Sequence, residues 1–169
     1  MRAMTDLARE YSQVDALHGG LPDFPRSFTG KGVLIGVIDT GFDFMHPAFR
    51  DAEGNSRIVH VWDQSGRNGN TPSMGYGVVF DTPELIRSAA HDVSRDTHGT
   101  HVAAIAASSA DVYKGMAPES DIVVVATDKS ESGIIDALAY LLDYAEKEKK
   151  PIAINLSMGT VIGFKDGTD

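Results

Sequence analysis

Three short apolar runs constrain the fold of this chain more than any other feature. They span residues 33–38, 122–126 and 152–156. Runs of this length, apolar at nearly every position, are typical of strands that are covered on both faces, as in parallel sheets. Because helical segments precede the second and third runs, we predict an α/β fold with a doubly wound parallel sheet and crossover helices.

Patterns between the apolar runs predict the other elements. Residues 57–62 alternate moderately and indicate an exposed or edge strand. Asp81 or Thr82 followed by Pro83 is a helix start signal, and an Ala-rich helix is expected from the D-T-H-G-T-H segment to Ala107. A third helix precedes Pro151. Its apolar residues with helical spacing, expected on one buried face, are Ile134, Ile135, Leu138, Leu141, Leu142 and Ala145.

Composition excludes several classes of function. The net charge of −9 argues against a nucleic-acid surface, which needs clustered Lys and Arg. The absence of Cys excludes disulfides, thiolate zinc sites and a cysteine nucleophile. No apolar run reaches the roughly 18 residues of a membrane span, and the first residues lack the apolar stretch of a signal peptide.

Two residues combine into a possible proton-transfer pair. Asp39 ends the first apolar run and is followed by Thr and Gly, and the carboxyl ends of parallel strands are where α/β proteins build sites. His98 stands at the expected start of a helix, where a charged imidazole needs a nearby carboxylate. Asp39 could supply it as the orienting member of a nucleophilic triad. Taken alone, each residue is also compatible with a purely structural role.

Four blocks resemble the subtilisin-like serine proteases. They are GKGVLIGVIDTGFDFMHPAF, DTHGTHVAAIAA, YKGMAPESDIVVVA and INLSMGT, in the family's order over roughly residues 30–160. The resemblance implies the subtilisin type of sheet, with only its first part present. It divides the chain into a lead-in segment, 1–29, and the amino-terminal part of a peptidase domain, 30–169.

The resemblance also implies roles for individual residues. Asp39 would orient the imidazole, and His98 would be general base and then general acid. Ser157, Met158 and Gly159 match the segment whose backbone pairs with peptide or protein substrate and forms a wall of the P1 pocket. His101, the second histidine of H-G-T-H, is similar to a helix-packing position in the family.

The family's nucleophile motif, G-T-S-x-A-x-P, is absent from these residues, as is the block with its oxyanion-hole Asn. Ser157 follows N-L and lacks the leading Gly of a nucleophile elbow. We therefore expect the final GFKDGTD to be a cut inside the fold and the isolated chain to be inactive. The parent would be a serine endopeptidase that uses an Asp-His-Ser triad.

Two other classes of function stay open. A non-catalytic subtilase-like pseudoprotease would bind peptides or regulate a partner. A zinc hydrolase could use His98, His101 and Asp39, although Gly99 stands where zinc hydrolases carry the Glu of H-E-x-x-H. We expect no required cofactor. The calcium site of many family members is doubtful because Ala48 replaces its Asp.

The family's strand order makes two further predictions. Strands 57–62, 122–126, 33–38 and 152–156 should be neighbours in that order, which leaves the last as an exposed edge through which the fragment could self-associate.

The stretch 57–90 is longer than in compact subtilisins and is similar to insertions in subtilases of anaerobic bacteria. Because subtilases are commonly exported, we expect an extracellular, bacterial location.

Overall fold

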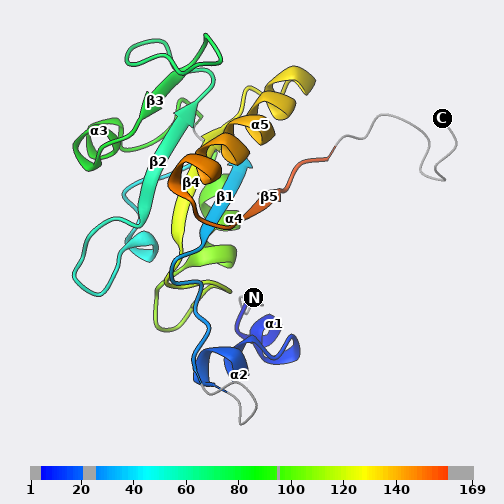
Figure 1. The fold of residues 1–169 in the computed structure, drawn as a ribbon. Coiled ribbons are helices and arrows are strands. Elements are labelled where there is room, and N and C mark those ends of the chain that lie inside the picture. The colour runs from blue at the N-terminus through cyan, green and yellow to red at the C-terminus, as the bar shows by residue number, and fades with distance from the viewer. Residues whose placement is uncertain (1–4, 21–25, 95, 160–169) are drawn as a thin grey trace, which may run out of the picture.

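The structure, a computed structural model, describes residues 5–20, 26–94 and 96–159. Its centre is a five-stranded sheet in the order β3-β2-β4-β1-β5 (Figure 1). The strands are β1 (Leu34–Asp39), β2 (Ile58–Asp63), β3 (Val78–Phe80), β4 (Asp121–Ala126) and β5 (Ile152–Leu156). All pairs are parallel except β2 with β3. The predicted α/β class and the predicted order of the four parallel strands are confirmed.

Helices cover both faces of the sheet, which explains the nearly continuous apolar strands (Figure 1). On one face, α3 (Pro83–Ala89), α4 (His98–Ala107) and the short 3₁₀ helix η1 (Pro47–Phe49) enclose a core. On the other face, α5 (Glu131–Glu148) packs over a second core. Within β1, for example, Val37 belongs to the first core and Ile38 to the second.

The expectation that residues 57–62 form an exposed or edge strand is wrong. β2 is almost fully buried and lies between β4 and β3. The antiparallel β3, which the sequence patterns did not predict, takes the outer position. A register shift between Ile58 and His60 marks a β-bulge, and a bulge changes the face to which the following side chains point. The alternation of residues 57–62 is therefore no measure of the strand's exposure.

The predicted buried face of α5 is only partly correct. Residues at i, i+4 spacing form the buried stripe, and all but Leu141 are small, namely Gly133, Ala137, Leu141 and Ala145. Ile135 is 66% exposed and Leu142 57% exposed. The small side chains allow the helix to approach the sheet closely, so the stripe of small residues, and not the stripe of largest residues, faces the core.

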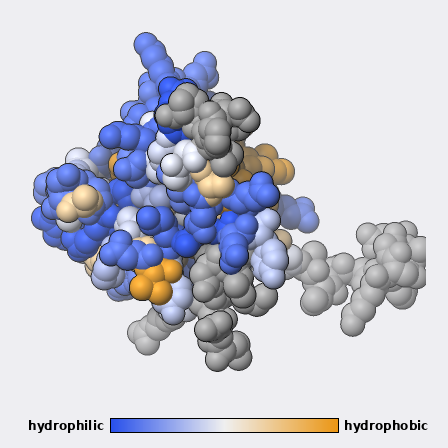
Figure 2. Space-filling view, turned by 90° about the horizontal axis from the view of Figure 1, so that it is seen from below, coloured by the Kyte–Doolittle hydropathy of each residue, from blue (hydrophilic) through white to orange (hydrophobic). Residues whose placement is uncertain are grey.

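The amino-terminal segment contains two short helices, α1 (Thr5–Tyr11) and α2 (Val14–Gly19), which lie beyond the amino ends of the parallel strands (Figure 1). His18 Nε2 lies 2.9 Å from the carbonyl oxygen of Met116, which ties α2 to the loop before β4. Seen from below, the described surface is mainly hydrophilic, with small separate hydrophobic patches (Figure 2). Among the described helices, none is long and apolar enough to cross a membrane. The terminal GFKDGTD segment lies outside the described residues.

Candidate active site

The D-T-G turn after β1 and the amino end of α4 are joined by backbone hydrogen bonds. Gly99 N donates to the carbonyl of Thr40 at 2.7 Å, and Thr100 N donates to the carbonyl of Gly41 at 3.0 Å. The first N–H groups of a helix have no partner within the helix, so carbonyls from another segment satisfy them here. This docking places the first residue of α4, His98, directly beside the end of β1.

Asp39 and His98 form a short hydrogen-bonded contact. His98 Nδ1 lies 2.9 Å from both carboxylate oxygens of Asp39. The Asp39 side chain is 3% exposed, whereas the His98 side chain is 49% exposed. Because an ionised carboxylate only accepts hydrogen bonds, Nδ1 carries the proton and Nε2 keeps a lone pair. A second bond, from Thr40 N to Asp39 Oδ1 at 2.7 Å, holds the carboxylate in place.

Close packing leaves no room for a side chain at two glycines of the motifs, Gly99 and Gly41. A Cβ on Gly99 would lie 2.8 Å from the Thr40 carbonyl oxygen and 2.8 Å from the ring of Phe42. Gly41 has φ +82°, and a Cβ there would lie 2.5 Å from the backbone of Asp96. The close approach of turn and helix that unites Asp39 with His98 is therefore possible only with glycine at both positions.

Asp92 is a site-supporting residue that sequence reasoning missed. Its carboxylate accepts hydrogen bonds from Gly41 N at 2.8 Å and Phe42 N at 3.1 Å, and so it fixes the turn that follows Asp39. Burial raises the pKa of Asp92, although these two bonds act in the opposite direction. A lone Asp in a polar stretch gives no sequence signal for this contact, which spans about fifty positions of the chain.

The predicted substrate segment lies at the same edge of the sheet. Leu156 pairs with Ile38, so Ser157 follows β5 where Asp39 ends β1. Ser157 Oγ donates to the side-chain oxygen of Asn155 at 2.8 Å. Met158 packs against the core under α5, and Gly159 is exposed with open space beside it. The segment flanks the pair, and its contact with substrate stays a prediction.

His101 does not occupy a packing position among the described residues. It is exposed, because Ala103 and Ala107 turn the opposite face of α4 toward the sheet. Within the part of the chain that the structure describes, no group of three His, Cys, Asp or Glu is placed to hold a metal ion. The residues that the zinc hypothesis needs thus form a pair, Asp39 with His98, and His101 points elsewhere.

Ala48, the residue at the doubtful calcium position, is buried and forms part of a backbone network. Its carbonyl oxygen accepts from Ser109 N at 2.9 Å and from Arg57 Nη2 at 3.2 Å. Arg57 also donates to the carbonyls of Ser120 and Ala107, the latter at the end of α4. The positive charge of the Arg57 guanidinium therefore stabilises the carboxyl end of α4.

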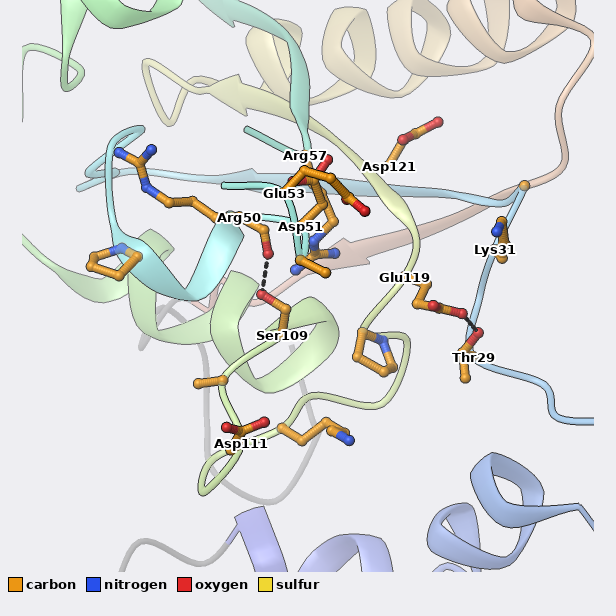
Figure 3. Close-up of a pocket in the computed structure, with 16 residues that line it drawn as sticks. Thr29, Lys31, Arg50, Asp51, Glu53, Arg57, Ser109, Asp111, Glu119 and Asp121 are labelled. Atoms are coloured by element: carbon orange, nitrogen blue, oxygen red, sulfur yellow. Dashed lines mark hydrogen bonds between the residues drawn. The ribbon is translucent and has the colours of Figure 1, made fainter. Parts of the chain in front are cut away.

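Arg57 and Ser109 of this network line a hollow of about 800 Å³ (Figure 3). Neither Asp39 nor His98 lines it. Lys31 and Arg57 line it just before β1 and β2, and Asp121 lines it at the start of β4. It therefore opens at the amino ends of the parallel strands, opposite the end where Asp39 and His98 meet. A smaller hollow of about 210 Å³ lies between Thr40, the residue after Asp39, and the loop that begins at Thr127.

The model of the subtilase family matches residues 30–169. The subtilisin-like protease PopC of Myxococcus xanthus is 32% identical over 139 residues, which are 77% of this chain and 25% of that protein. An intracellular serine protease of Paenibacillus polymyxa is 31% identical over 133 residues, which are 77% of this chain and 34% of that protein. The chain thus spans about a quarter to a third of the length of these relatives.

A solved structure agrees with the sequence comparisons. The CspB protease of Clostridium perfringens superposes with a TM-score of 0.65 and 31% sequence identity, covering 84% of this chain and 32% of that one. The family match includes the D-T-G turn, the H-G-T-H helix and the strand before Ser157. With this sheet, these motifs and this match, the chain belongs to the subtilase family of serine proteases.

Proposed function

We propose that the protein containing this chain is a serine endopeptidase in which His98 acts as general base and Asp39 as its orienting partner. The observation that supports this most is the two-oxygen contact of the buried Asp39 carboxylate with His98 Nδ1. It fixes the imidazole with Nε2 toward solvent, where Nε2 could take a proton from an attacking hydroxyl and return it to the leaving amine.

The nucleophile of this reaction is not assigned to a residue of this chain. Among the described residues, no serine hydroxyl is hydrogen-bonded to His98. Ser157 is engaged with Asn155 and lies in the segment proposed to bind substrate backbone. We propose that the serine and the oxyanion donor come from outside these 169 residues, so that the isolated chain has no peptidase activity.

Substrate would bind along the segment that follows β5. The proposed backbone contacts are those of an added strand next to Ser157, Met158 and Gly159, with side chains entering pockets. The polar hollow beside Thr40 would then accept a side chain of the peptide close to the cleaved bond. No required cofactor is proposed, and the substrates are peptides or proteins.

A covalent probe tests the proposal. The full-length protein would be incubated with a fluorophosphonate, which labels only activated serines, and the labelled residue identified by mass spectrometry. We expect labelling of one serine beyond residue 169 and its loss in His98→Ala, with circular dichroism and the thermal midpoint confirming that the variant is folded.

The opposite result favours the second class of function. If the folded full-length protein, freed of any pro-segment, takes up no probe, the serine protease proposal fails. A peptide-binding pseudoprotease then becomes the better explanation, because the substrate-binding segment would persist without a working nucleophile.

Export of the protein also stays a prediction, since one relative is named as an intracellular protease.

A further inference from the structure

A pocket between the 57–90 insertion and α5 has no part in the proposed protease site. We call it the aromatic pocket. It has a volume of about 340 Å³ and is lined by His60, Ser73, Asp81, Tyr140, Asp143, Tyr144, Lys147 and Glu148. It lies on the α5 side of the sheet, next to β2. Because β4 lies between β2 and β1, the pocket is separated from Asp39 at the end of β1.

Aromatic rings from two elements form its wall. The Tyr144 ring lies 4.5 Å from the His60 ring, and the Tyr140 ring lies 5.8 Å from it, centre to centre. Tyr140 in turn packs 4.7 Å from Trp62. The faces of tyrosine rings carry negative electrostatic potential and attract cations that approach within about 6 Å.

His60 places a polar atom at the base of the pocket. The β-bulge after Ile58 precedes it, and the residue is only 8% exposed. Its Nε2 lies 2.7 Å from the Tyr140 hydroxyl, whereas Nδ1 makes no hydrogen bond among the described residues. Burial lowers the pKa of His60 to about 4, so the ring is neutral at pH 7. The proposal below requires the tautomer in which Nε2 donates to Tyr140, because Nδ1 then presents an accepting lone pair.

The charges around the rim select the sign of a ligand. Asp81, Asp143 and Glu148 are opposed by one cation, Lys147. Lys147 forms no ion pair with them in the described structure. The rim is therefore net negative and disfavours anions. No group of three His, Cys, Asp or Glu among the described residues fits a metal ion, so an organic cation suits the pocket better.

We propose that the aromatic pocket binds a primary ammonium group on an alkyl chain. The ammonium would donate to His60 Nδ1 and lie close to the Tyr144 ring and the rim carboxylates, while the alkyl chain lies against Tyr140. Such a group occurs on the lysine side chain of a protein and on small free amines. This would give the 57–90 insertion, which forms one side of the pocket, a ligand-binding role that is independent of proteolysis.

Trp62 makes the proposal directly testable on this chain, because it is the only tryptophan and it touches Tyr140. Its fluorescence would be followed at pH 7 and constant ionic strength during titration with n-butylammonium, and separately with an acetylated Gly-Lys-Gly amide. We expect saturable binding of at least one, and the tighter of the two identifies a free amine or a lysine side chain as the source. Butanol and butyrate serve as neutral and anionic controls.

Two exposed rim residues give variants with opposite predicted signs. Asp81→Asn should weaken ammonium binding and Lys147→Gln should strengthen it, each by about threefold, the size expected for one unit charge several ångströms away in water. Tyr144→Leu should weaken binding about fivefold or more through loss of the ring. Glu131→Gln, at the far end of α5, is the matched control and should leave binding unchanged.

Three results would overturn the proposal. They are no saturation with either amine, an equal response to butanol, or weaker binding in Lys147→Gln. If Tyr144→Leu fails to fold, the two rim variants still decide the sign of the ligand, because both positions are exposed.

Discussion

The Asp39–His98 pair joins a buried carboxylate to a half-exposed imidazole, and this asymmetry makes the role of Asp39 testable. In Asp39→Asn the amide can donate toward Nδ1, which favours the tautomer with the proton on Nε2. We expect kcat of the full-length protein to fall by about 10⁴-fold, the size typical of triads that lose this carboxylate. Kinetics on a peptide substrate would measure the loss. Asp111→Asn, an exposed carboxylate, should retain activity.

Gly99 is predicted to be intolerant of even one added methyl group. Gly99→Ala should lower the free energy of unfolding by about 1–3 kcal/mol, because the new Cβ would overlap the Thr40 carbonyl oxygen. Urea unfolding of the chain measures this change. Gly19→Ala, where nothing lies within 4 Å of an added Cβ, is the control and should change stability little. Equal stability of Gly99→Ala and wild type would contradict the close docking of turn and helix.

His60 predicts a pH dependence of stability. Its folded pKa of about 4 is below the ordinary value of 6.5, so the unfolded chain binds the proton more readily. The stability that neutral His60 contributes is fully present above pH 6.5 and is lost as pH falls toward 4, to a total of about 3 kcal/mol.

Denaturant unfolding at pH 7 and pH 4.5 checks this loss. In His60→Gln, whose amide can still bond to Tyr140, the difference between the two pH values should shrink. Carboxylates with raised pKa values, such as Asp63 and Asp92, also make stability depend on pH. Because they are present in both the wild type and the variant, their contribution cancels when the two are compared. An unchanged pH dependence in the variant would show that His60 is not its source.

At the scale of elements, α5 depends on a single capping side chain. Ser130 Oγ accepts from Gly133 N at 2.9 Å and satisfies one free N–H of the first turn. Ser130→Ala should lower the free energy of unfolding by about 1 kcal/mol. Thermal or urea unfolding measures it, with Ser88→Ala on the exposed face of α3 as the control. A loss no larger than that of the control would mean that the cap adds nothing.

The insertion shows how an element depends on its neighbours. β3 is only three residues long and pairs with β2 through residues 78–80, so its sequence has too few alternations to predict a strand. Gln64 then links the insertion to α5, because its side chain donates to the carbonyl of Gly133 at 2.7 Å. Such contacts join positions far apart in sequence and could not be predicted from local patterns.

At the scale of the whole molecule, β5 lies at one edge of the described sheet, with β1 as its one neighbour there. Leu156 on this strand is 41% exposed, and Leu142 of α5 is 57% exposed. We predict that the 169-residue chain self-associates through this edge, because unpaired strand groups and exposed apolar side chains favour association.

Sedimentation velocity tests this at high micromolar concentration. Leu142→Lys with Leu156→Lys should shift the chain toward monomer. Leu85→Lys, on α3 near the opposite edge, should not. A wild-type chain that remains monomeric at these concentrations would disprove the association.

The sequence by itself determined the four parallel strands and their order, the main helices and the pairing of Asp39 with His98. Strands buried on both faces show their burial in every residue, and the family motifs place both residues in known blocks. Tertiary structure decided the exposure of Ile135 and His101 and the role of Asp92. These depend on which neighbour packs against a segment, and a helix pattern reveals that a face is apolar but not whether another segment covers it.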